Sequence, residues 1–288
     1  MNSITGTTRL TALLGSPVSH SISPLMHNEA FRILGLDYVY LCFDVNEDRL
    51  DAAVYGLKQC GIRGFNLTMP CKNRMVKLAD RLSPAAGLIG AVNTVVVDDG
   101  IMTGHNTDGV GFMRAVRETG FSCSGASIVI LGAGGAASAI AVQAALDGAG
   151  CIRVFLRSSG RFTQRMSGLA ERISRETSCT CTVHDLADQA FLRQAINEST
   201  LLINATPVGM APDTEGSLIT DTSLFRPGLF VADIIYNPRE TRLLREAAAA
   251  GCTVMNGMNM LLYQGAEAFR LWTGHDMPVD EIRAKYFL

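Results

Sequence analysis

The sequence has no marked excess of either charge, and this absence narrows the choice of partners. Lysine and arginine total 25 against 27 aspartates and glutamates, so the formal net charge is −2. A chain without a basic stripe gives little support for binding nucleic acid or an anionic membrane surface. We therefore expect a small-molecule substrate, no nucleic acid and no membrane.

The cysteines and histidines also lack the spacings that hold metals or build disulfide frameworks. None of the eight cysteines forms a C-x-x-C pair, and the five histidines show no H-x-x-x-H spacing. These absences argue against zinc and against a disulfide framework. Most cysteines lie in apolar runs, as reduced core residues of a cytosolic protein do. We expect no metal and a cytoplasmic location.

Targeting and membrane-spanning segments are not indicated either. Residues 1–14 do not combine a charged start with a long apolar run, so they make a poor signal peptide. Residues 126–145 carry no charge and would be long enough to span a membrane. However, three glycines interrupt this segment after a short β-rich run, which favours a buried strand followed by a buried helix.

What the chain does have is a regular alternation of strand and helix patterns. Strands are expected at 10–14, 38–45, 64–67, 127–131, 152–156, 181–184, 201–204, 230–234 and 253–255. Helices are expected, among others, at 75–82, 110–119 and 258–272, and a hairpin at 91–104. Pro24 follows Ser23, which predicts that Ser23 caps a helix. The alternation predicts an α/β protein with parallel sheets covered by helices on both faces.

A glycine-rich turn follows the apolar strand at 127–131. It consists of Gly132, Ala133, Gly134, Gly135 and Ala136. Small residues between a strand and a helix let a pyrophosphate approach the backbone amides at the helix N-terminus. The same turn could also serve tight packing without a ligand, but its position between strand and helix favours nucleotide binding.

The loop after the next strand bears on the choice of nucleotide. It contains Arg157, Ser158 and Arg161 but no acidic residue. NAD-selective sites usually place an acid near this point to hold the ribose 2′-hydroxyl. Guanidinium and hydroxyl groups suit a 2′-phosphate instead. A solvated basic loop is the alternative, so NADP is favoured and NAD stays open.

Three polar islands stand in otherwise apolar surroundings. They are the segments 19–24, 66–72, and 93–94 taken together with 106–109. Ser21 and Ser23, two residues apart on an extended segment, would point the same way beside a helix N-terminus and suit a carboxylate.

These islands and the glycine turn together resemble the shikimate dehydrogenase family, and within it the shikimate/quinate dehydrogenase branch. The matching segments run in family order over nearly the whole chain, and they are H-S-x-S-P at 20–24, N-x-T-x-P-x-K at 66–72, G-A-V-N-T at 90–94, N-T-D at 106–108, the turn at 132–136, N-A-T at 204–206, Y-N-P at 236–238 and Q-G-A at 264–266. Leu156 departs from the pattern at a place that is commonly asparagine, and Asn259 stands where glycine is common.

The resemblance implies an N-terminal α/β substrate domain and a Rossmann-type doubly wound parallel-sheet nucleotide domain, with the active site in the cleft between them. The substrate domain would comprise 1–108, completed by 257–288, and the nucleotide domain 109–256. Lys72 and Asp108 match the family's catalytic pair. Positions matching substrate contacts are Ser21, Ser23, Tyr40, Asn66, Thr68, Asn93, Thr107 and Gln264. Positions matching cofactor contacts are the turn 132–136, Arg157, Ser158, Arg161, Asn204, Ala205, Thr206, Tyr236, Gly257 and Met260.

The resulting prediction is a shikimate dehydrogenase that reversibly reduces 3-dehydroshikimate to shikimate with NADP(H), in aromatic amino-acid biosynthesis. Three alternatives stay open: a quinate/shikimate dehydrogenase using NAD or NADP, another Rossmann enzyme such as a folate or amino-acid dehydrogenase, and a non-catalytic nucleotide-sensing module. The presence of both Lys72 and Asp108 favours an enzyme over the sensing module. A homodimer is compatible with the sequence, which does not itself determine the oligomeric state.

Overall fold

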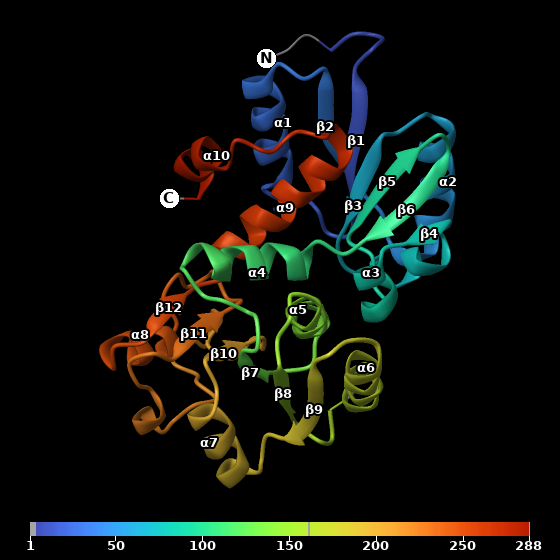
Figure 1. Ribbon diagram of the computed structural model, residues 1–288. Coiled ribbons are helices and arrows are strands. Elements are labelled where there is room, and N and C mark those ends of the chain that lie inside the picture. Colours follow the sequence, from blue (N-terminus) through green and yellow to red (C-terminus); the bar gives the residue numbers. More distant parts are fainter. Residues whose placement is uncertain (1–3, 161, 288) are drawn as a thin grey trace. The chain divides into compact units, whose positions relative to one another are not determined.

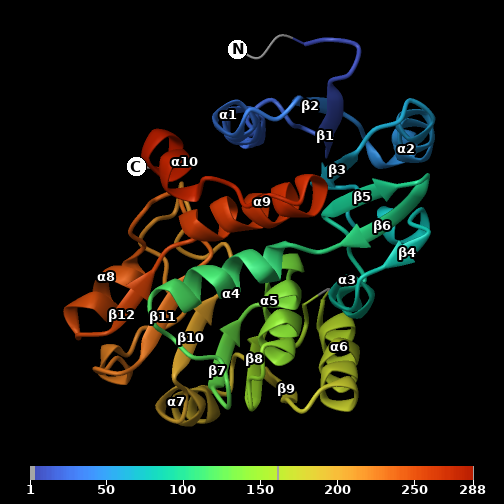
Figure 2. The ribbon, with the colours of Figure 1, turned by 45° about the horizontal axis from the view of Figure 1, so that its top comes forward.

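The computed structural model describes residues 4–160 and 162–287. The chain divides into two compact units. The first extends to Gly111 and resumes at Leu262, and the second is Phe112–Leu261. Each unit has its own six-stranded sheet. Both sheets are seen in Figure 1 and, from another direction, in Figure 2.

The sheet of the first unit is mixed. Its strands are β1 (Arg9–Gly15), β2 (Tyr38–Asp44), β3 (Gly64–Leu67), β4 (Arg81–Leu82), β5 (Thr94–Asp98) and β6 (Ile101–His105). They lie in the order β2-β1-β3-β5-β6-β4. The pairs β3–β5 and β5–β6 are antiparallel and the other pairs are parallel. The predicted hairpin is confirmed as β5 and β6, and its antiparallel pairing makes this sheet mixed.

Short helices surround this sheet. They are α1 (Ser23–Leu34), η1 (Glu47–Arg49), α2 (Leu50–Gln59), η2 (Arg74–Lys77), α3 (Pro84–Ile89) and α10 (Val279–Tyr286). An apolar core of Leu14, Val54, Phe65 and Val95 with their neighbours lies on one face of the strands. The ion pair Lys285–Glu29, 2.8 Å long, ties α10 to α1.

Two expectations about local structure in this unit are wrong. The helix predicted over 75–82 is instead η2 followed by β4, which pairs with β6 through Arg81 and Leu82. Ser23 is the first residue of α1 and not its cap; Ile22 holds the cap position, with no capping side chain. The Ser23 N–H is bound by the Ser21 hydroxyl oxygen at 3.2 Å.

Two helices contribute to both units along the chain. Helix α4 (Asp108–Glu118) leaves the first sheet, and α9 (Met258–Thr273) returns to it. In the first unit Trp272 of α9 donates its Nε1–H to the Val95 carbonyl at 2.9 Å. A Cβ on Gly64 would lie 2.3 Å from that indole nitrogen, so only glycine allows this approach.

The sheet of the second unit is entirely parallel, as expected. Its strands are β7 (Ser127–Leu131), β8 (Cys151–Leu156), β9 (Thr180–Asp185), β10 (Leu201–Asn204), β11 (Phe230–Asp233) and β12 (Thr253–Met255). The order β12-β11-β10-β7-β8-β9 is that of a doubly wound dinucleotide-binding fold. The direction of winding reverses between β7 and β10, where ligands of such sheets bind at the carboxyl ends of the strands.

Helices cover both faces of this parallel sheet. They are α5 (Gly135–Leu146), α6 (Thr163–Glu176), α7 (Gln189–Asn197), η3 (Thr222–Leu224) and α8 (Arg242–Ala249). Leu192 of α7 and Leu244 of α8 share one apolar core with Val129 and Val231 of the strands. The uncharged segment at 126–145 is β7 followed by α5, as the glycines indicated. Within the described ranges no helix is long and apolar enough to cross a membrane.

Candidate functional site

The first unit brings Lys72 and Asp108 together. The Lys72 Nζ lies 2.6 Å from the Asp108 Oδ2, and both side chains are partly exposed, at 27% and 17%. Lys72 follows β3 in the chain, and its carbonyl accepts the Val92 N–H at 2.9 Å. Asp108 begins α4, where an acidic residue interacts favourably with the helix dipole. The pair therefore has one face available to a ligand.

Asn93 orients the other oxygen of the aspartate. Its Nδ2–H donates to the Asp108 Oδ1 at 2.8 Å, and its Oδ1 accepts the Thr107 N–H at 2.8 Å. Asn93 is 2% exposed, so water has little access to its amide to compete for these hydrogen bonds. These contacts leave Asp108 with a lysine on one oxygen and an amide on the other.

A fully buried threonine connects this group to a second one. The Thr94 hydroxyl donates to the Asn93 Oδ1 at 2.9 Å and accepts from the Asn66 Nδ2 at 3.0 Å. The Asn66 Oδ1 in turn accepts the Tyr40 hydroxyl proton at 2.8 Å. Thr94 and Tyr40 are both 0% exposed.

The hydrogen bonds run in one direction from the tyrosine toward the aspartate. A tyrosine hydroxyl donates to the first asparagine, which donates to the threonine, which donates to the second asparagine, which donates to the carboxylate. Reversing one amide would place two donors or two acceptors against each other in a buried site, which costs free energy. The network therefore fixes the orientation of both amides.

The other predicted substrate positions lie around this network. Burial raises the pKa of Tyr40 well above its usual value, and a hydrogen bond with the Ser23 side chain opposes the rise. The Ser21 hydroxyl oxygen accepts a hydrogen bond from the Ser23 N–H. Thr68 and Gln264 are half-buried, and the Thr68 N–H donates to the Leu14 carbonyl at 2.9 Å.

In the second unit the glycine turn has the geometry that a pyrophosphate needs. Gly132 has φ +111°, and a Cβ there would lie 2.7 Å from the Ala205 carbonyl oxygen, so no other residue fits. A Cβ on Gly134 or Gly135 would meet nothing within 4 Å, so the backbone there is open. Helix α5 starts at Gly135, and no side chain caps it. Its free N-terminal amides fit an anionic phosphate group.

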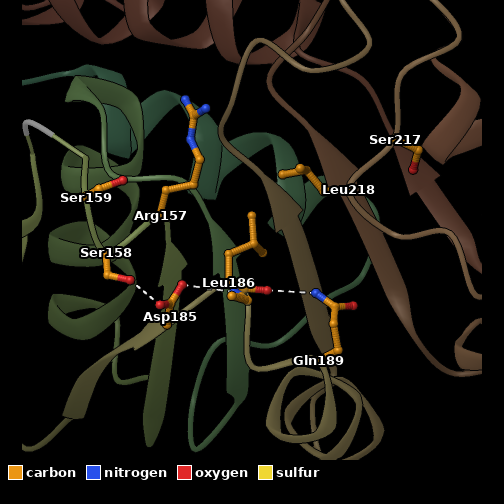
Figure 3. Close-up of a pocket in the computed structure, with 9 residues that line it drawn as sticks. Arg157, Ser158, Ser159, Asp185, Leu186, Gln189, Ser217 and Leu218 are labelled. Carbon is orange, nitrogen blue, oxygen red and sulfur yellow. Dashed lines mark hydrogen bonds between the residues drawn. The ribbon is translucent and has the colours of Figure 1, made fainter.

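Arg157 and Ser158 line a pocket at the carboxyl ends of β8 and β9 (Figure 3). Its volume is about 500 Å³, and the lining residues are Arg157, Ser158, Ser159, Asp185, Leu186, Ala187, Gln189, Ser217 and Leu218. The third residue predicted for the 2′-phosphate, Arg161, lies outside the described residues.

Asn204 ends β10, Thr206 follows it, and a buried carboxylate holds Asn204 in place. The Asn204 Oδ1 accepts the Thr206 hydroxyl at 2.7 Å, and its Nδ2 donates to the Asp233 Oδ1 at 3.1 Å. Asp233 also accepts from the Thr241 hydroxyl at 2.8 Å, and burial raises its pKa. This group fixes the loop that lies against Gly132.

The remaining predicted cofactor positions differ in their surroundings. A Cβ on Gly257 would lie 1.9 Å from the Ile234 carbonyl oxygen, so glycine is required where α9 begins. Tyr236 is 49% exposed, and Met260 is half-buried. Both side chains are therefore accessible to a ligand.

Thr94, Asp185 and Asp233 belong to these groups but were not predicted from the sequence. Thr94 was noted only as part of its polar island, and Asp185 and Asp233 end strands β9 and β11. A strand-end aspartate is a signal that could have identified the last two. The central place of Thr94 depends on the register that sets it opposite Asn66.

No group of three or more histidine, cysteine, aspartate and glutamate side chains suited to a metal ion occurs among residues 4–160 and 162–287. All eight cysteines are free thiols; four are buried, whereas Cys60 is exposed.

A doubly wound nucleotide-binding sheet in one unit and a lysine–aspartate pair in a polar site in the other define the class of NAD(P)-dependent oxidoreductases. Comparisons with known proteins specify the family within that class. Residues 13–95 match the shikimate dehydrogenase substrate binding domain, and residues 257–285 match the shikimate 5′-dehydrogenase C-terminal domain.

Relatives of this chain extend over nearly its whole length. The shikimate dehydrogenase (NADP(+)) of Listeria innocua is 48% identical over 284 residues, which are 99% of this chain and 97% of the relative. The crystal structure of shikimate 5-dehydrogenase from Listeria monocytogenes with shikimate and NAD has a TM-score of 0.96 at 48% identity, covering 99% and 98% of the two chains. Quinate dehydrogenase from Corynebacterium glutamicum with NAD has a TM-score of 0.86 at 30% identity, covering 97% and 99%. The chain belongs to the shikimate dehydrogenase family.

Proposed function

We propose that this chain is a shikimate dehydrogenase that reversibly reduces 3-dehydroshikimate to shikimate with NADP(H). The observation that carries the proposal is the 2.6 Å contact between Lys72 and Asp108, whose second oxygen is held by Asn93. Relatives with 48% identity over nearly the full length support the substrate and the cofactor.

The residues of the first unit would bind the substrate and move its proton. Oxidising a secondary alcohol requires a group that takes the hydroxyl proton, and reduction requires one that returns it to the carbonyl oxygen. Lys72 and Asp108 would carry out this transfer as a pair. The asparagine and threonine side chains supply both donors and acceptors, as the hydroxyls of a polyhydroxylated ring require.

The second unit would hold the dinucleotide. The glycine turn and the uncapped start of α5 fit its pyrophosphate, and Arg157 fits the 2′-phosphate of NADP. When bound, the nicotinamide accepts the hydride in the oxidation and supplies it in the reduction.

The decisive experiment crosses shikimate and quinate with NADP⁺ and NAD⁺ and follows the absorbance of the reduced nicotinamide. Lys72→Ala should lose at least about a thousandfold in kcat while binding 2′,5′-ADP as the wild type does. Lys77→Ala is the matched control, because Lys77 is an exposed lysine five residues later. A Lys72→Ala enzyme that kept most of its rate would refute the proton-transfer assignment.

Quinate is the second candidate substrate. The similarity to the quinate dehydrogenase of Corynebacterium glutamicum favours it. Turnover of quinate in the crossed assay would extend the substrate class. Failure of both acids, with nucleotide still bound, would favour a sensing module or another alcohol.

We also propose a homodimer in the cytoplasm. Strand β2 is an edge of its sheet, and Leu41 on it is 45% exposed, as a surface covered by a second copy would be. Light scattering at micromolar concentration would show the mass of one chain if the dimer is wrong. The free thiols support a reducing compartment, which cell fractionation would test.

A further inference from the structure

The pocket at the ends of β8 and β9 contains two opposite charges that do not neutralise each other. Arg157 and Asp185 both line it. Figure 3 shows the Arg157 side chain extending away from the Asp185 carboxylate. Within the described part of the chain, Arg157 takes part in no ion pair. The pocket thus offers a cation to an anionic ligand and, separately, an anion to a hydrogen-bond donor.

Asp185 is held in place as an anion. Its Oδ1 accepts the Ala187 N–H at 2.9 Å, and its Oδ2 accepts the Ser158 hydroxyl. The Ala187 N–H and then the Ser158 hydroxyl lower the pKa of Asp185 below its usual value. Two donors thus fix the position of this charge, although the residue is exposed to solvent.

The bond to Asp185 also determines what Ser158 can offer a ligand. A serine hydroxyl has one proton, and here that proton is directed at a carboxylate. A phosphate needs donors, so the Ser158 hydroxyl offers no proton to a 2′-phosphate while this bond persists. Among the residues that line the pocket, Arg157 and Ser159 of this loop carry side chains that can donate.

The two charges have opposite effects on the two nicotinamide dinucleotides. A carboxylate accepts a hydrogen bond from a ribose 2′-hydroxyl, and for this reason NAD-selective folds usually place an acid near the ribose. The same carboxylate repels a 2′-phosphate, whereas a guanidinium attracts it. The loop after β8 contains no such acid among its described residues, but β9 supplies one at its last position.

On the basis of the proposed function, we propose that Asp185 is a specificity-determining residue that opposes Arg157 and sets the ratio of NADP to NAD affinity. Removing its charge shifts the enzyme toward NADP, and removing the charge of Arg157 shifts it toward NAD. Both dinucleotides remain usable because neither charge acts alone.

The test is the dissociation constant of NADP⁺ and of NAD⁺, measured by calorimetry on wild type and Asp185→Asn. We expect Asp185→Asn to lower the dissociation constant of NADP⁺ about threefold to tenfold and to raise that of NAD⁺ about twofold to threefold. The gain in NADP⁺ affinity should shrink as sodium chloride rises from about 20 mM to about 0.5 M, because the repulsion between Asp185 and the 2′-phosphate is exposed to solvent. The variant should also bind the fragment 2′,5′-ADP more tightly than wild type does, whereas its affinity for ADP should not increase.

Asp188→Asn is the matched control. Asp188 ends the loop between β9 and α7 and caps α7 through the Phe191 N–H at 3.0 Å, but it does not line the pocket. Asparagine caps a helix as well as aspartate does, so this variant removes one charge and preserves the fold. The ratio of the two affinities should stay within about twofold of wild type.

Two failures can be told apart. If the wild type binds both dinucleotides and oxidises shikimate, but Asp185→Asn leaves the affinity ratio unchanged or weakens both equally, the role of Asp185 is refuted. If the wild type binds neither dinucleotide, the proposed function itself fails.

Discussion

His27 should make the first unit sensitive to acid. It lies on α1 with 0% of its surface exposed, and its ring stacks on Tyr40 with centroids 4.5 Å apart and planes at 15°. Within the described residues, neither ring nitrogen has a hydrogen-bond partner. Burial without a partner disfavours the charged imidazolium and lowers the pKa of His27 from 6.5 to about 3.

The sign and size of the effect follow from proton linkage. The folded state keeps the imidazole neutral, whereas the unfolded chain takes up a proton below pH 6.5. His27 therefore does not lower the free energy of unfolding above pH 6.5, and this free energy falls as the pH drops from 6.5 toward 3. Each pH unit in this interval costs about 1.4 kcal/mol, so at about pH 5 the loss is about 2 kcal/mol.

The assay is urea unfolding at about pH 7.5 and about pH 5, followed by the fluorescence of Trp272. This is the only tryptophan in the chain; it is 1% exposed, and its ring lies 5.2 Å from that of His27. The signal therefore reports on the unit that contains the histidine. His27→Phe preserves an aromatic ring. It should reduce the difference in the free energy of unfolding between the two pH values by about 2 kcal/mol.

His275→Gln is the control, since that histidine is exposed on the surface. It should keep the pH dependence of the wild type. If His27→Phe and wild type lose the same stability between the two pH values, burial of His27 is not the cause of the acid sensitivity.

Two further predictions concern the polar network and the glycine turn. Thr94→Val should raise the KM for shikimate about tenfold, because each of two buried asparagines loses one hydrogen bond, whereas Thr94→Ser should restore it; equal kinetics for the two variants would contradict the role of the hydroxyl. Gly132→Ala should weaken NADP⁺ binding at least about tenfold and lower the free energy of unfolding by about 1–3 kcal/mol, because its Cβ would meet the Ala205 carbonyl at positive φ; calorimetry and urea unfolding measure the two effects, and unchanged affinity would contradict the close approach.

Much of the second unit could be predicted from the sequence because its signals are local. Strands β7 and β10 have the predicted limits, since a short apolar run bounded by polar or glycine residues indicates a buried parallel strand. The glycine turn was identified in the same way, because small residues between an apolar strand and a helix form a local pattern.

The first unit shows where local signals fail. The apolar spacing over 75–82 predicted a helix, but β4 exists only because β6 offers Arg81 and Leu82 an edge to pair with. Likewise, the hairpin was predicted, but its place against β3, which makes the sheet mixed, is a long-range pairing. Such pairings involve residues far apart in the chain, and the pattern of one segment does not specify its partner.

By itself, the sequence determined the order of strands in the second unit, the glycine turn and the resemblance that singled out Lys72 and Asp108. The tertiary structure decided which groups act together: Thr94 between two asparagines, Asp185 against Ser158, and His27 among aromatic rings. The physical reason is that a turn or a strand depends on neighbouring residues, whereas a hydrogen-bond partner or a desolvated charge depends on what the fold brings alongside.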